Sequence, residues 1–326
     1  MCLGGDSCGN DSQTTSCLFV TIKRAEMERG AVRMESSGGI VNIGELTKPA
    51  TVLVEKISDA VGGIFRPYQI RRIAEAEAHA EKVKAVSQIE ISELQHRAMR
   101  RFFCEEANKQ QNIESIAASA LPQLSDAATP ENLEDDWIIN LFDKCRLISD
   151  EGMQVLWSRI LAGEANAPGR FSKRTINLLS SLDKSDAELF RSLCSFNWWL
   201  GNFVPLVFDV NDPIYSSGGI SFNTLIHLDE VGLISFEAIA GFRRARLPQK
   251  FTASYYGREI VINFPRPEDN DLRIGTVLLS KVGQELGSIC DSAPLPEFFE
   301  YSIDRWRSLG VTVESAQAPS REEGRV

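Results

Sequence analysis

DEGMQVLWSRILAGEANAPGRFSKRTINLLSSL, residues 150–182, contains two amphipathic runs joined by an elbow with glycine, proline and basic residues. Apolar residues recur every three or four positions, as on one face of a helix: Met153, Leu156, Trp157, Ile160 and Leu161, then Ile176, Leu179 and Leu182. Asp150 and Ser172 are typical helix N-caps, and Gly163 suits a helix C-terminus. We therefore predict two packed helices, with the elbow as the corner between them.

The neighbouring runs extend this pattern to a helical bundle over residues 121–196. More apolar residues recur at helical spacing: Trp137, Leu141, Phe142, Cys145, Ile148, Leu189, Leu193 and Phe196. Ser185 is a credible N-cap for the last helix, and residues 121–130 are interpreted as a linker. We expect Trp137, Leu156, Trp157 and Ile160 to hold the bundle together.

Residues 68–119 contain no glycine or proline and are dense in good helix formers. Apolar and small residues recur there at spacings of three and four, an eleven-residue repeat: Ala76, Ala80, Val83, Ser87, Ile91, Leu94, Ala98 and Phe102. A helix of about 50 residues is about 75 Å long, more than a small domain covers. We predict a coiled-coil-like self-association seam and a homo-oligomer; a hairpin folded back within one chain is the alternative.

Residues 45–67 form a shorter amphipathic segment before the long helix. Leu53, Ile57, Val61 and Ile64 share one face, which we expect to pack into the oligomer; attachment to a membrane surface is the alternative. Residues 1–44 have no such periodicity. We predict that they are a disordered extension or a misassigned start, with translation beginning at Met34.

Residues 197–311 mix helical and strand-like runs. ISFNTLIHLDEVGLISF indicates a helix and then a strand, KFTASYYGREIVINF a hairpin, and GTVLLSKVGQELGSIC a strand and then a helix. This order is similar to a winged-helix domain, and residues 312–326 are predicted to be a disordered tail. We expect a mainly α fold, with a long N-terminal helix, a helical bundle and a winged-helix-like α+β C-terminal module.

Composition limits the function classes. The chain has 326 residues, 43% hydrophobic and 25% charged, with a formal net charge of -10; an acidic chain does not attract nucleic acid or anionic lipid non-specifically. No apolar run is long enough for a transmembrane segment. The seven cysteines are odd in number and scattered, which favours a reducing compartment, so we predict a cytoplasmic protein.

Candidate chemical groups are few. His79 and His96 lie far apart on one helix, and His227 is expected to be a packed or surface residue. Cys2, Cys8 and Cys17 lack metal-ligand spacing, and the acidic cluster Glu131, Glu134, Asp135 and Asp136 suits a helix N-terminus better than a metal. We predict no catalytic residues, no metal site and no cofactor.

Two basic regions remain. Arg159, with Lys173 and Arg174, is interpreted as scaffolding in which Arg159 covers Trp157 or pairs with Asp150 or Glu164. The loop GFRRARLPQK, residues 241–250, offers a nucleic-acid or partner contact through Arg243, Arg244, Arg246 and Lys250. The preceding helix carries Asp229 and Glu230 without a basic residue, so we favour a solvated loop or a contact with a protein partner over nucleic acid.

Three stretches resemble a known bacterial family: residues 45–78, residues 134–190 (EDDWIINLFDKCRL to KSDAELF) and residues 227–236 (HLDEVGLISF). The chain strongly resembles the family catalogued as domain of unknown function 2806, over roughly residues 44–306. That resemblance implies no activity and no site residues. The order of these elements also looks like the Abi-alpha family, named for phage abortive infection, which implies phage defence or stress response.

These observations favour a non-enzymatic scaffold or interaction protein that forms a homo-oligomer with an unknown protein partner. A winged-helix DNA-binding regulator is the first alternative, and a membrane-surface effector is the second. An enzyme is the least favoured class because the residues supply no acid, base or nucleophile in a recognisable arrangement.

Overall fold

The computed structural model describes residues 46–62 and 93–315. The chain divides into two units, Met1–Asn42 and Ile43–Val326, and all the described residues belong to the second. Several predictions lie outside the described residues: the N-terminal extension, His79, the tail beyond residue 315, and five residues of the predicted repeat, Ala76, Ala80, Val83, Ser87 and Ile91.

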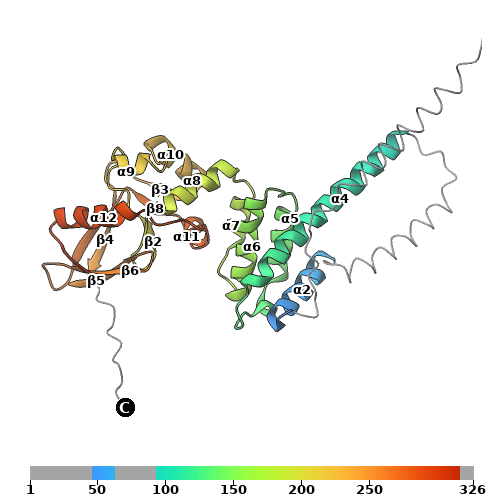
Figure 1. The fold of residues 1–326 in the computed structure, drawn as a ribbon, viewed down its shortest axis with the longest axis horizontal. Helices are drawn as coiled ribbons and strands as arrows, with labels where there is room; N and C mark the ends of the chain where they lie inside the picture. The colour runs from blue at the N-terminus through green and yellow to red at the C-terminus, as the bar shows by residue number, and fades with distance from the viewer. Residues whose placement is uncertain (1–45, 63–92, 316–326) are drawn as a thin grey trace, which may run out of the picture. The chain divides into compact units, whose positions relative to one another are not determined.

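The first part of the described chain is helical (Figure 1). Its elements are α2 (Lys48–Val61), α4 (Glu93–Ala120), the 3-10 turns η2 (Leu121–Gln123) and η3 (Pro130–Asn132), α5 (Asp135–Cys145), α6 (Glu151–Asn166), α7 (Lys173–Leu179) and α8 (Lys184–Cys194). The predicted apolar faces of α5 and α6 form the core, where Trp157 and Ile160 are 0% exposed. The predicted corner between α6 and α7 is confirmed.

The helix ends confirm two predicted caps and correct two others. The side chain of Asp150 accepts from Met153 N at 3.0 Å, and that of Ser172 accepts from Thr175 N at 3.4 Å. The N-cap of α8 is Asp183 rather than Ser185. Gly163 does not end α6, which continues to Asn166. A Cβ at residue 163 would lie 2.6 Å from the ring of Phe171, so glycine is needed there for packing.

The two halves of α4 differ in their surroundings. Ile116, Ala117 and Ala120 are 0% exposed and lie on the half that packs against α6. Every residue from 93 to 108 is exposed. The predicted long helix is therefore observed from Glu93 onward, and none of the other described residues covers its first four turns.

The apolar face of α2 packs within the chain. Leu53 and Ile57 are 0% exposed, and α2 lies against α5 and η3. Lys56 Nζ donates to the carbonyl of Leu133 at 3.2 Å and pairs with Asp135 at 2.9 Å. The expectation that this face packs into an oligomer is wrong. Because the face is buried within the chain, it is also not available to bind a membrane surface.

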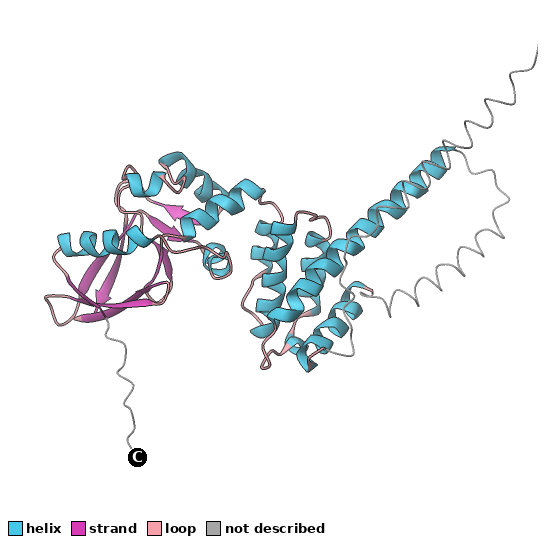
Figure 2. Ribbon diagram, viewed as in Figure 1, coloured by secondary structure: helices cyan, strands magenta, loops and turns pink. Residues whose placement is uncertain are grey.

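Strands begin after α8 (Figure 2). The elements are β1 (Asn197–Trp199), β2 (Phe203–Pro205), α9 (Pro213–Ser216), α10 (Phe222–Val231), β3 (Ile234–Phe236), β4 (Phe242–Leu247), β5 (Lys250–Tyr255), β6 (Arg258–Asn263), β7 (Asn270–Gly275), β8 (Val277–Leu279), α11 (Lys281–Gly287), α12 (Pro296–Ser308) and β9 (Thr312–Ser315). The predicted pairs of elements are confirmed as α10 with β3, the β5–β6 hairpin, and β8 with α11.

The strands form one five-stranded sheet, in the order β2-β1-β5-β6-β9, and two ribbons, β3-β8 and β4-β7. All named strand pairs are antiparallel. The fold is therefore mixed α+β, and the mainly α prediction describes only the first part. Two further predictions are wrong: the basic loop contains strand β4, and the tail expected to be disordered from residue 312 begins with β9, where Val313 lies opposite Ile262.

Aromatic residues attach α12 to the five-stranded sheet. The Trp198 ring of β1 stacks on Phe299 at 5.5 Å and meets Trp306 edge-on at 4.8 Å. Trp198 Nε1 donates to Ser302 Oγ at 3.2 Å, so the indole is satisfied inside this core. Across the described ranges, none of the helices combines the length and apolar character required to cross a membrane.

Candidate functional site

The described members of the predicted seam lie on the uncovered part of α4. Leu94 is 68% exposed and Phe102 is 58% exposed, and Ala98 is also exposed. Two apolar residues that were not predicted, Met99 and Phe103, are exposed beside them. A helix that exposes this much apolar surface is typical of an interaction site.

The elbow between α6 and α7 is organised by a buried carboxylate. Glu164 is 5% exposed, and it accepts from Gly169 N at 2.6 Å and from Phe171 N at 2.7 Å. Burial raises the pKa of Glu164, while these backbone N–H groups act in the opposite direction. Trp137 Nε1 donates to the Phe171 carbonyl at 2.8 Å. The elbow is thus a structural corner, as predicted.

The same elbow contacts α11 and the residues after it. Glu285 Oε2 accepts from Ser172 N at 2.9 Å and from Thr175 Oγ1 at 2.5 Å. Arg159 donates to the Ile289 carbonyl at 2.9 Å and to Asp291 at 3.0 Å. The expectation that Arg159 pairs with Asp150 or Glu164 is wrong, because its guanidinium reaches across to the C-terminal part of the chain.

Two of the acidic candidates and His227 are engaged in structural contacts. Asp135 pairs with Lys56, and Asp136 lies 3.9 Å from Lys173. His227 Nε2 lies 2.8 Å from Asp186 Oδ1, which ties α10 to α8. Among the described residues, no cluster of three or more histidine, cysteine or acidic side chains has a metal-binding arrangement.

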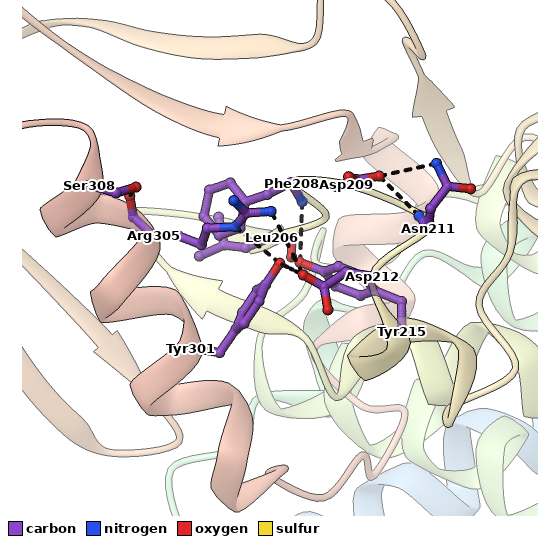
Figure 3. Close-up of polar contacts among 9 residues, drawn as sticks. All are labelled: Leu206, Phe208, Asp209, Asn211, Asp212, Tyr215, Tyr301, Arg305 and Ser308. Atoms are coloured by element: carbon purple, nitrogen blue, oxygen red, sulfur yellow. Dashed lines mark hydrogen bonds and ion pairs between the residues drawn. The ribbon is translucent and has the colours of Figure 1, made fainter.

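A polar network joins α12 to the segment between β2 and α9 (Figure 3). Tyr301 Oη donates to Asp212 Oδ2 at 2.8 Å and accepts from Arg305 Nε at 3.3 Å. Tyr215 Oη donates to the Leu206 carbonyl at 2.8 Å. Burial raises the pKa of both tyrosines, so their hydroxyls stay neutral and act as hydrogen-bonding groups rather than as bases.

The predicted basic residues separate into two environments. Arg244 donates to Asn202 Oδ1 at 2.8 Å, and its guanidinium lies 5.6 Å from the Phe251 ring centroid. Arg243 is exposed and lies opposite Arg273 of β7, a cross-strand neighbour that the sequence did not indicate. Arg246 and Lys250 are also exposed. The structure thus engages Arg244 in the fold and adds Arg273 to the exposed basic residues.

A pocket of about 270 Å³ lies beside the β1–β2 hairpin and the end of α11. It is lined by Asn197, Trp199, Phe203, Ser254, Tyr256, Gly287, Ser288, Asp291 and Ser292. Asn197 is 6% exposed, and its Oδ1 has no hydrogen-bond partner within the described part of the chain. Tyr256 Oη lies 2.5 Å from Ser292 Oγ at the edge of this pocket.

Two cysteines lie near residues that line the pocket. The Cys194 and Cys290 thiols are close enough to influence each other's pKa. The neighbouring Cys194 thiol, and then Ser292, lower the pKa of Cys290 to about 7 against the opposing effect of burial. Burial raises the pKa of Cys194 well above its usual value. Sequence reasoning missed this pair because the two cysteines are far apart in the chain and have no local spacing motif.

Comparison with known proteins gives a family and no activity. No curated protein matches the chain, and no solved structure matches it. A family model described as a protein of unknown function (DUF2806) matches residues 96–302, which is more than half of the chain. The chain therefore belongs to the DUF2806 family.

Proposed function

We propose that this protein is a non-enzymatic scaffold that self-associates through the apolar face of α4. The observation that carries the proposal is the uncovered half of this helix, residues 93–108, which displays Leu94, Met99, Phe102 and Phe103. In a single chain these side chains remain in water, and burying each would stabilise an assembly by about 1.5–3 kcal/mol.

The exposed face continues the buried face of the same helix. Residues 18 apart lie five turns apart at 3.6 residues per turn, and therefore point the same way. Ala98, Met99 and Phe102 are related in this manner to Ile116, Ala117 and Ala120, all three of which are buried against the bundle. The face that α6 covers in the second half is thus left exposed in the first half by the part of the chain that the structure describes.

A second copy of the chain is the occupant that we propose for this face. Charged side chains of α4 form ion pairs within the helix itself, Arg97 with Glu93 at 3.7 Å and Arg101 with Glu105 at 3.3 Å. The seam pattern also continues toward Ala76 in the sequence, which favours a long helix–helix contact. The resemblance to the Abi-alpha family favours phage defence or stress response as the setting.

The test replaces two seam residues, Met99→Glu with Phe102→Glu, in the full chain. We expect light scattering to show a lower mass than wild type at equal concentration, because two carboxylates on the seam oppose association. The control places the same charges on the opposite face, Cys104→Glu with Asn108→Glu, and should keep the wild-type mass. An unchanged mass in the seam variant, with helicity retained by circular dichroism, would refute the proposal.

Binding of nucleic acid by a winged-helix-like module is the second candidate function. The observation that favours it is the cross-strand pair Arg243 and Arg273, since like charges opposite one another destabilise a ribbon unless an anion lies between them. We rank it second because Arg244 is engaged in the fold and α10 carries Asp229 and Glu230.

Duplex DNA in a gel-shift assay tests this second function. Arg243→Glu with Arg273→Glu should abolish a shift and lower the slope of log affinity against log salt by about 2. Arg191→Glu with Arg307→Glu, at exposed sites elsewhere, should leave the shift intact. Absence of any shift for wild type at about 50 mM salt excludes the function, because electrostatic binding is strong at low salt.

A further inference from the structure

We propose that Cys290 and Cys194 form a peroxide-reactive dithiol, in which Cys290 attacks the peroxide and Cys194 resolves the product into a disulfide. This site is independent of the α4 seam. It is a modification site, and its substrate class is hydrogen peroxide or a small organic hydroperoxide.

The positions of the two sulfurs support the pairing. Cys290 Sγ lies 3.5 Å from the carbonyl oxygen of Gly287, and a Cβ placed on Gly287 would lie 3.7 Å from Cys194 Sγ. Both sulfurs therefore lie against the same residue at the end of α11. Tyr256 Oη, which donates to the Cys194 carbonyl at 3.1 Å, holds the end of α8 near this point.

Access decides which cysteine reacts first. Cys194 is 0% exposed, whereas Cys290 is partly exposed. The residues on both sides of Cys290, namely Gly287, Ser288, Asp291 and Ser292, line the pocket. Cys290 is thus next to the pocket in sequence and is itself partly exposed, so a small peroxide reaches it before the fully buried Cys194, which acts as the resolving thiol.

The electrostatic asymmetry of the pair agrees with this order. The neighbouring Cys194 thiol, and then Ser292, lower the pKa of Cys290, which favours Cys290 over Cys194 as the thiolate. Burial raises the pKa of Cys194, which remains a thiol. The thiolate is the nucleophile in such reactions, and a value near ambient pH combines thiolate population with nucleophilicity.

The reaction balances in two steps. The Cys290 thiolate attacks one oxygen of hydrogen peroxide, the O–O bond breaks, and Cys290 becomes a sulfenic acid while hydroxide leaves and takes up a proton as water. The Cys194 sulfur then attacks the sulfenic sulfur, a second water leaves with the Cys194 proton, and the S–S bond forms. Peroxide is the oxidant, and the two thiols together lose two electrons.

The experiment treats the full, reduced protein with about one equivalent of hydrogen peroxide and locates disulfides by peptide mapping. We expect a Cys194–Cys290 disulfide, a mass loss of about 2 Da that dithiothreitol reverses, and no dependence on Cys104, tested with Cys104→Ser. Cys194→Ser should instead accumulate a sulfenic acid at Cys290 that dimedone traps. Cys290→Ser should leave Cys194 reduced.

The pH dependence gives an independent readout on the unmodified protein. Alkylation of Cys290 by iodoacetamide should rise as the pH passes through about 7 and level off above it, because the thiolate population follows the lowered pKa. The proposal is overturned if Cys194 and Cys290 both remain reduced while Cys104 oxidises. It is equally overturned if Cys194→Ser yields no dimedone adduct at Cys290 although circular dichroism shows a folded protein.

Discussion

Single buried polar groups hold the corner between α6 and α7, and Glu164 is the principal one. Its carboxylate accepts two backbone N–H groups, from Gly169 and Phe171. The Phe171 carbonyl then accepts from Trp137, so the carboxylate, the elbow and α5 are connected in sequence. Residues that the sequence presents as an irregular glycine and proline loop are therefore fixed by one side chain from the preceding helix.

Glu164→Gln tests that role. The amide has one acceptor oxygen where the carboxylate has two, and its NH2 group faces a backbone donor, which leaves a buried N–H unsatisfied. We expect the free energy of unfolding to fall by about 1–3 kcal/mol, measured by urea denaturation. Glu230→Gln, at an exposed position of α10, should change it by less than about 0.5 kcal/mol. Equal stability of the two variants would contradict the assignment.

Individual elements differ in how well the sequence predicted them. The apolar residues of α5 and α6 recur at helical spacing. This pattern is local in the sequence, so both helices were predicted. Strand β4 was interpreted as a loop because its arginines mask the alternation and a bulge interrupts it between Arg244 and Leu247. Strand β9 has only Val313 as a buried apolar residue, and its pairing with β6 comes from the fold.

The sequence of α12 has a helical pattern, although this helix was not predicted. Pro296 stands in its first turn, and Phe298, Phe299, Ile303 and Trp306 follow at helical spacing and are all buried. No local sequence pattern indicates the Cys194–Cys290 pair, because the end of α8 and the end of α11 meet only when the C-terminal part folds. The helix that carries Leu94, Ala98 and Phe102, in contrast, was predicted because its pattern is local to α4; association through these residues stays a prediction.

At the scale of the whole molecule, charged hydrogen bonds connect the helical bundle with the C-terminal α+β part. Glu285 of α11 accepts from Ser172 and Thr175 at the start of α7. Arg159 of α6 reaches Ile289 and Asp291 beyond α11. Because each side supplies groups that the other side satisfies, separation of the two parts would leave backbone and charged groups without partners. We therefore expect the described parts to unfold as one cooperative unit.

Arg159→Ala with Glu285→Ala tests this coupling by differential scanning calorimetry. Hydrogen bonds to charged groups contribute about 1.5–3 kcal/mol each. Their loss should therefore either split the single unfolding transition into two or lower the temperature at which unfolding begins. Arg307→Ala with Glu230→Ala removes the same charges at exposed sites and should preserve a single transition. Two transitions in the wild-type protein itself would show that the contacts at the elbow do not couple the two parts, and that each core is stable without the other.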